Sequence, residues 1–257
     1  MDFKSWRQDI ETWYNAYVSG YLTAGDKENI IIKRDHSLRV CANMVQLATA
    51  LGCNDSEQQI AAVIGILHDV GRFEQIRRYG TFSDARSVSH AALGVEILNT
   101  ETVLNSTDAD IRELVITAIR HHSALRLPSH LTGKTLFFCQ LIRDADKLDI
   151  FKVVTDYYQR ASDKRNPSIE LDLVDDAGYN PAMLDAICRK EDVDYRKAQN
   201  LNDFKILQAG WVFSLYFTPT LVLLRKRGYL TKLRAALPRD DGIDALFEII
   251  GKHQIAE

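Results

Sequence analysis

The first half of the sequence contains almost nothing that would break a helix. The chain has only five prolines, and none of them precedes Pro128. A sustained alternation of apolar and polar residues, which would indicate exposed strands, is absent, whereas apolar residues recur at helical spacing through much of the chain. The pattern therefore excludes a β-rich fold and predicts an all-α protein.

Three further absences narrow the function. Lys and Arg number 32 against 35 Asp and Glu, and no basic run occurs, so we expect no long nucleic acid as a partner. No apolar run of membrane-spanning length and no apolar signal core is present, so we expect a soluble, cytoplasmic protein without a membrane partner. None of the four cysteines forms a C-x-x-C pair, which favours reduced thiols over a zinc knuckle or a disulfide framework. The oligomeric state is left open.

The apolar pattern also predicts the order of the helices. One helix is expected from His36 to Leu51, and polar caps at residues 54–56 precede a second over 57–68. Residues 60–67 are apolar on all sides, which predicts a central, buried helix that ends at Gly71. Further helices are expected at 90–98, 110–120, 136–151 and 205–227, the last interrupted by Pro219, with loops at 72–89, 123–133 and 161–181.

Residues 1–155 are expected to form the domain that carries the functional site. The remainder, 156–257, is expected to be a helical C-terminal extension packed on that domain within the same globule.

Histidine and aspartate gather near the ends of these predicted helices. His36 is expected to open one helix, the pair His68-Asp69 closes the buried one, and Asp146 projects from an apolar stripe, where an unpaired carboxylate would be costly. Each histidine alone is compatible with a helix cap or a surface position, but five of the seven histidines share this placement. The candidate metal ligands are His36, His68, Asp69, His90, His121, His122 and Asp146.

This set of residue types indicates metal chemistry. Imidazole and carboxylate together bind Fe, Mn, Co, Ni or Zn, and they leave room for Mg. A metal with an open coordination position lowers the pKa of bound water, and two neighbouring metals stabilise both oxygens of a phosphoryl transfer. We therefore expect one or two divalent metals.

Cationic residues lie near the candidate ligands in sequence. Arg72 follows His68-Asp69 closely, and Lys147 is adjacent to Asp146, so both are candidates for stabilising charge on a phosphoryl group. Arg77, Arg78 and Tyr79 are candidates for binding substrate, although the two arginines are equally compatible with a solvated loop.

The ordered set H…HD…H…HH…D, from His36 to Asp146, resembles the HD-domain superfamily of metal-dependent phosphohydrolases. The resemblance implies an HD-domain helical bundle in which His36, His68, Asp69 and Asp146 hold one metal. The segment that begins at His90 and the His121-His122 pair are similar to those of HD-GYP cyclic-dinucleotide phosphodiesterases, which use additional histidines for a second metal. Two departures stand out: residues 123–128 lack the Gly-Tyr-Pro signature, and Arg72 replaces the usual lysine.

The resemblance implies hydrolysis of a small phosphomonoester or phosphodiester, in particular a nucleotide, by metal-activated water. In this hypothesis Asp69, Lys147 and Arg72 are catalytic. Two alternatives remain open at this point. One is a di-iron oxygenase of the HD fold, and the other is a metal-binding signalling module without catalysis.

Overall fold

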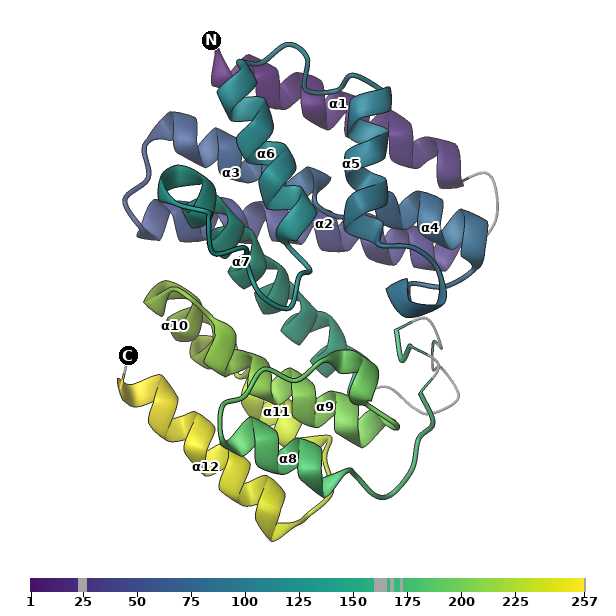
Figure 1. The fold of residues 1–257 in the computed structure, drawn as a ribbon, viewed down its shortest axis with the longest axis vertical. Helices are drawn as coiled ribbons and strands as arrows, with labels where there is room; N and C mark the ends of the chain where they lie inside the picture. The colour runs from purple at the N-terminus through teal and green to yellow at the C-terminus, as the bar shows by residue number, and fades with distance from the viewer. Residues whose placement is uncertain (23–26, 160–165, 167–168, 172, 257) are drawn as a thin grey trace. The chain divides into compact units, whose positions relative to one another are not determined.

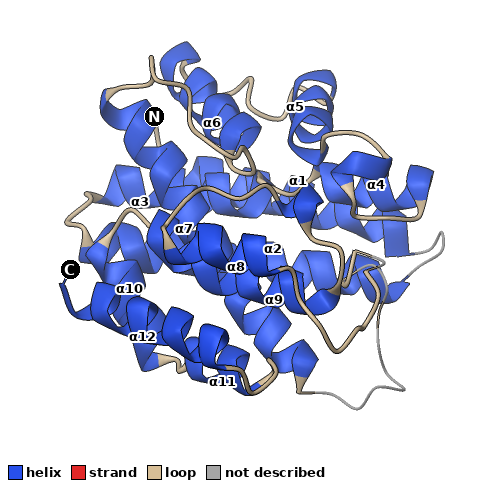
Figure 2. Cartoon of the chain, turned by 60° about the horizontal axis from the view of Figure 1, so that its bottom comes forward, coloured by secondary structure: helices blue, strands red, loops and turns tan. Residues whose placement is uncertain are grey.

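The computed structural model describes residues 1–22, 27–159, 166, 169–171 and 173–256. Within these residues every regular element is a helix, and the only β-type pairing is an isolated bridge between Val174 and Asn200 (Figure 2). The predicted all-α class is therefore confirmed. No helix in the described residues is long and apolar enough to cross a membrane.

The chain divides into two compact units, residues 1–149 and 150–257. This boundary lies near the predicted one at 155, and the packing of the second part on the first stays a prediction. The helices of the first unit are α1 (Phe3–Leu22), α2 (Lys27–Ala50), α3 (Asp55–Leu67), α4 (Gly71–Tyr79), α5 (His90–Thr100), α6 (Ala109–His121) and most of α7 (Gly133–Tyr158) (Figure 1).

Helix α3 forms the centre of the first unit. It packs against α1, α2 and α6, and every residue from Ile60 to Leu67 is buried, as the all-round apolar pattern predicts. Its start is fixed by a capping box, in which the backbone N–H of Glu57 donates to Asn54 Oδ1 and that of Asn54 donates to Glu57 Oε2. The capping box thus fixes where the chain enters α3; the helix ends at Leu67, and His68 and Asp69 follow it.

Close packing of α2 on α3 depends on Gly65. A Cβ atom at this position would lie 2.7 Å from the Cα of Cys41, which is too close for any side chain. Gly65 thus lets the two backbones approach each other. As a result, His36 on α2 lies beside His68 at the end of α3.

Two helix predictions need correction. The first predicted helix begins earlier, at Lys27, so His36 lies in the middle of α2 rather than at its start. Gly71 does not terminate a helix but begins α4, where residues 72–79 of the predicted loop are helical and bury Phe73 and Ile76. Gly71 is required for a different reason, because a Cβ there would lie 2.2 Å from the carbonyl oxygen of His90.

The second unit is also helical. Its helices are α8 (Pro181–Cys188), α9 (Leu201–Gly210), α10 (Thr218–Lys226), α11 (Tyr229–Ala235) and α12 (Asp241–Ala256) (Figure 1). The helix predicted over 205–227 is split after Gly210, and Pro219 lies in the first turn of α10, where its missing N–H costs no hydrogen bond. The connection predicted at 161–181 lies partly outside the described residues. The four cysteines form no disulfide, and Cys41 and Cys139 are buried.

Candidate metal centre

The turn between α3 and α4 carries the centre of the site. His68 caps the end of α3, and Asp69 and Val70 follow before α4 begins at Gly71. Because Gly71 has no side chain, the start of α5 approaches this turn closely, which brings His90 next to Asp69.

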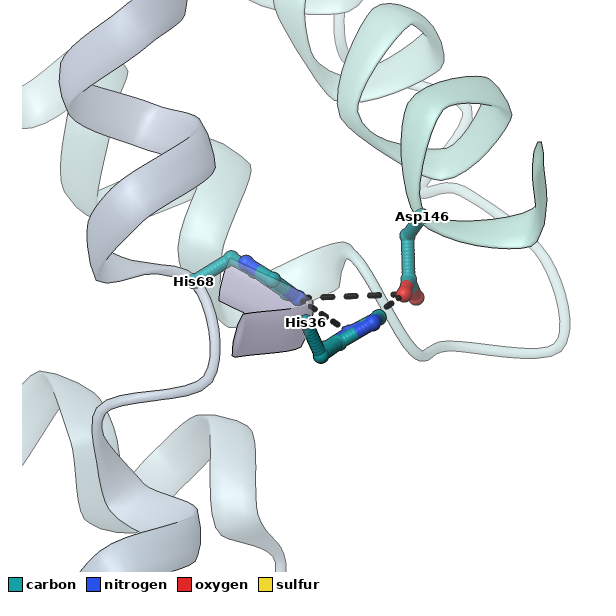
Figure 3. A group of neighbouring side chains, drawn as sticks. All are labelled: His36, His68 and Asp146. Atoms are coloured by element: carbon teal, nitrogen blue, oxygen red, sulfur yellow. Dashed lines mark hydrogen bonds and ion pairs between the residues drawn. The ribbon is translucent and has the colours of Figure 1, made fainter. Parts of the chain in front are cut away.

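His36, His68 and Asp146 form one half of the site. Their side chains extend from α2, the end of α3 and α7, and they point at one another (Figure 3). The Nε2 atoms of the two histidines lie 3.2 Å apart, and Asp146 Oδ1 lies 3.1 Å from His36 Nε2 and 3.7 Å from His68 Nε2. These three ligand atoms are close enough to surround a single ion.

His90 and His122 form the other half. The Nε2 atom of His90, from the start of α5, lies 2.9 Å from that of His122, which follows the last residue of α6. Both rings are almost completely buried.

Asp69 joins the two halves. Its Oδ2 lies 3.5 Å from His36 Nε2 and 3.8 Å from His68 Nε2. Its Oδ1 lies 3.4 Å from His90 Nε2 and 3.7 Å from His122 Nε2. One carboxylate oxygen thus faces each half, which is the arrangement of a bridging ligand.

In each of the four histidine rings of the cluster, the Nδ1 atom has a hydrogen-bond partner, and this partner determines which nitrogen carries the proton in the neutral ring. Each Nδ1 lies 2.7 Å from an oxygen: His36 from Asp149, His68 from the Gly65 carbonyl, His90 from Asp84 and His122 from the Ile119 carbonyl. Carbonyls and carboxylates accept hydrogen bonds, so each neutral ring carries its proton on Nδ1 and a lone pair on Nε2. The lone pairs of His90 and His122 face each other at 2.9 Å and repel each other unless a cation lies between them. The donor set therefore fits divalent metal ions.

The charge states of these side chains agree with this assignment. Burial lowers the pKa of His90 to about 3, with Arg72 contributing in the same direction, so the ring is neutral and able to act as a ligand. Burial also lowers the pKa of His68. For Asp69 burial opposes ionisation, but Lys33 and His68 hold its pKa well below the usual range.

His36 differs from the other rings. Burial lowers its pKa, but the carboxylates of Asp146 and Asp149 outweigh that effect and raise it to about 9. In the half of the site around His36, these carboxylates therefore favour positive charge on or beside the ring.

Of the predicted pair His121-His122, only His122 reaches the cluster. Adjacent helical residues point about 100° apart, so one of the two had to face away. The ring of His121 is half-buried, and its pKa is lowered by burial and by Arg120. Arg143 fixes this end of α6 by donating to the carbonyls of His121 and His122.

The predicted cationic residues have different surroundings. Arg72 is close to the cluster, with its Nε 3.5 Å from Asp69 Oδ1. Arg77 and Arg78 both bind the buried carboxylate of Glu74, and the neighbouring Tyr79 is exposed at the end of α4. Lys147 follows Asp146 on α7 and is partly buried. The roles of these five residues in substrate binding or catalysis stay predictions.

The structure adds three residues that the sequence analysis did not select. Asp84 and Asp149 orient His90 and His36, and Lys33 lies with its Nζ 2.9 Å from Asp69 Oδ2. The sequence does contain a signal for two of them, because helical spacing places Lys33 one turn before His36 and Asp149 one turn after Asp146. Asp84 lies in a short 3-10 segment (Asp84–Arg86), for which no periodicity argument applies.

Comparison with known proteins identifies one family. The family model described as HD domain matches residues 34–177, a stretch that contains every histidine and aspartate of the cluster. No curated protein and no solved structure matches the chain.

Proposed function

The chain belongs to the HD domain family, and on this premise we propose that it is a metal-dependent phosphohydrolase acting on a small phosphomonoester or phosphodiester. The observation that carries the proposal is the position of Asp69, which presents one oxygen to His36 and His68 and the other to His90 and His122. Bound divalent metals would supply an activated water and Lewis-acid stabilisation of phosphoryl oxygens.

The residues of the chain have separable tasks in this proposal. Asp146, His36 and His68 would hold one ion, His90 and His122 the other, and Asp69 would bind both. Asp149 and Asp84 keep the rings of His36 and His90 in the orientation that presents Nε2. Lys33 and Arg72 bring positive charge next to the ligands, where a phosphoryl group gains negative charge during reaction.

Nucleotides are the substrate class that we favour. Tyr79 presents an exposed ring on α4, the helix that follows His68-Asp69, and exposed aromatic rings stack well on bases. Arg77 and Arg78 precede it and share the carboxylate of Glu74, so the group keeps one net positive charge, which suits an anionic substrate.

Oxygenation at a di-iron centre is the second candidate. It is favoured by the nitrogen-rich donor set, since four imidazoles and two carboxylates also suit a pair of iron ions. Oxygen consumption by the Fe²⁺-loaded protein in the presence of substrate would support this reading, whereas hydrolysis without oxygen uptake supports ours.

A screen of phosphorylated small molecules tests the proposal. The protein is loaded separately with Mn²⁺, Co²⁺, Ni²⁺ and Fe²⁺, its metal content is measured, and phosphate release or ester cleavage is followed with the His68→Ala variant in parallel. We expect hydrolysis that requires metal and is lost in the variant. Cleavage that is equal in both proteins, or no cleavage of any phosphoester by fully loaded protein, would contradict the proposal.

A further inference from the structure

Lys33 lies at an unusual place in the site. Its ammonium group lies 2.9 Å from Asp69 Oδ2, the same oxygen that lies 3.5 Å from His36 Nε2. An ammonium group cannot act as a metal ligand, because it has no lone pair. Lys33 is therefore a fixed positive charge at the edge of a cluster that itself attracts cations.

Two positive charges that share one carboxylate oxygen repel each other strongly in a buried setting. A cation held between His36 and Asp69 would stand in this relation to Lys33. An anion that contacts both positive charges is attracted by each of them, and this attraction offsets the repulsion between the two charges. The placement of Lys33 thus favours an anionic ligand next to the His36 half of the site.

The exposure of the side chains indicates where such an anionic ligand can reach the cluster. The side chains of His36, His68 and Asp69 are at most 4% exposed, whereas Lys33 is 18% exposed and Asp146 is 15% exposed. Solvent therefore reaches the cluster at Lys33 and Asp146 on the His36 half, and also at Arg72, which is 15% exposed and lies beside Asp69 Oδ1. A ligand entering on the His36 half meets the Lys33 ammonium group.

Arg72 is differently committed. Its Nη1 donates to the Phe82 carbonyl, at 2.5 Å, and to Asp84 Oδ1, at 3.0 Å. Asp84 in turn accepts a hydrogen bond from His90 Nδ1. Arg72 thus ties the segment around Phe82 and Asp84 to α4 and, through Asp84, orients His90.

We propose that Lys33 is the residue that contacts the phosphoryl oxygens of the substrate, and that Arg72 is a positioning residue for the His90 half of the site. This inference rests on the proposed function and assigns the anion contact to a residue that lies just before the part of the chain matched by the family model. The ligand chemistry is a phosphoryl group with at least one unesterified oxygen.

Binding of inorganic phosphate to the Mn²⁺-loaded protein tests the assignment. Calorimetry gives the dissociation constant, and elemental analysis gives the metal content of the same samples. The variants are Lys33→Met, which removes the charge, Lys33→Arg, which keeps it, and Arg34→Gln. Arg34 pairs with Asp35 on the same helix, so this control removes a neighbouring charge outside the site.

We expect Lys33→Met to weaken phosphate binding by about tenfold or more, the loss of one charge-assisted hydrogen bond, with metal content unchanged. Lys33→Arg should retain most of the affinity, and Arg34→Gln should match the wild type. Arg72→Gln should lower metal content, and Arg72→Lys should restore part of it, as befits a residue that positions a ligand.

Wild-type affinity for phosphate in Lys33→Met, or loss of metal from that variant, would overturn the assignment. If Lys33→Met does not fold, as judged by circular dichroism, equal weakening in Lys33→Arg and Arg34→Gln would also overturn it. Failure of the proposed function is distinguishable: the wild type would then bind phosphate through Lys33 and yet cleave no phosphoester. A wild type that cleaves phosphoesters while Lys33→Met binds phosphate normally would refute this inference alone.

Discussion

His90 and His122 are 32 residues apart in the sequence, yet their Nε2 atoms lie 2.9 Å from each other. Both rings already donate from Nδ1, to Asp84 and to the Ile119 carbonyl. Two lone pairs therefore face each other in the interior of the first unit, next to Asp69 Oδ1. Such an arrangement is stable when a cation lies between the rings.

The adjacent histidines at the end of α6 provide a matched pair of variants. His122→Ala should remove one metal ion per chain and lower hydrolysis by at least about a hundredfold, because water activation and charge stabilisation depend on that ion. His121→Ala should keep the metal content and the rate of the wild type. Elemental analysis and phosphate release measure both. If the two variants behaved alike, the assignment of His122 rather than His121 as a metal ligand would be wrong.

The carboxylates behind the histidines should control metal affinity separately in the two halves. We expect Asp84→Asn and Asp149→Asn each to weaken binding of one ion by about 10- to 100-fold, since each loses the negative charge that orients and polarises a ligating ring. Metal titration followed by calorimetry measures this effect. Asp35→Asn is the control, because Asp35 pairs with Arg34 outside the cluster. Simultaneous loss of both ions from either variant would argue against two separate halves.

Asp69→Ala should abolish hydrolysis while the fold is retained. Asp69 is the residue that faces all four Nε2 atoms, so its loss removes a shared ligand and its negative charge. We expect a fall of several powers of ten in rate, because both functions of the metals are lost together. Far-UV circular dichroism should stay unchanged, since the apolar residues 60–67 bury α3 without help from the metals. A variant that retains about a tenth of the wild-type rate has lost only about 1.4 kcal/mol of transition-state stabilisation, which would rule out this role.

Glu74 should contribute to stability in a pH-dependent manner. Hydrogen bonds from Arg77 lower its pKa, against the effect of burial, and Arg78 and Tyr21 bring it to about 2 from an ordinary value of 4.5. A lowered folded-state pKa stabilises the protein above the unfolded-state value, and the contribution is lost as pH falls from 4.5 toward 2.

Glu74→Gln should therefore lower the free energy of unfolding by about 1 kcal/mol at neutral pH, a figure reduced for solvent screening of the exposed arginines. The difference from wild type should shrink as the pH approaches the acid limit of that window. Urea unfolding at several pH values measures it, and Glu96→Gln, at an exposed position on α5, is the control. A difference that stays constant with pH would show that packing rather than charge accounts for the loss.

Much of the site followed from the sequence because its ligands belong to regular helices. The buried helix before His68-Asp69 and the apolar stripe below Asp146 were predicted from periodicity, and the structure brings these residues together. Position within a helix was harder to predict. His36 lies in the middle of α2, because the apolar pattern continues upstream to Ile30.

Other features depend on contacts between distant segments. The sequence predicts a helix stop at Gly71, but the absence of a side chain there allows α5 to approach, and only the packed structure reveals that contact. Asp84 comes from a short segment with no periodic signal, so its pairing with His90 was not predictable. The choice between His121 and His122 required the rotation of α6 about its axis, which the sequence does not specify.

Anomalous X-ray diffraction from crystals grown with Mn²⁺ locates the bound metals directly. We expect two anomalous peaks per chain, one among His36, His68 and Asp146 and the other beside His90 and His122, with one oxygen of Asp69 bound to each. The same protein should hydrolyse a phosphoester from the screen. A single peak, or two peaks that are not both in contact with Asp69, would contradict the bridged two-metal centre on which the proposed function depends.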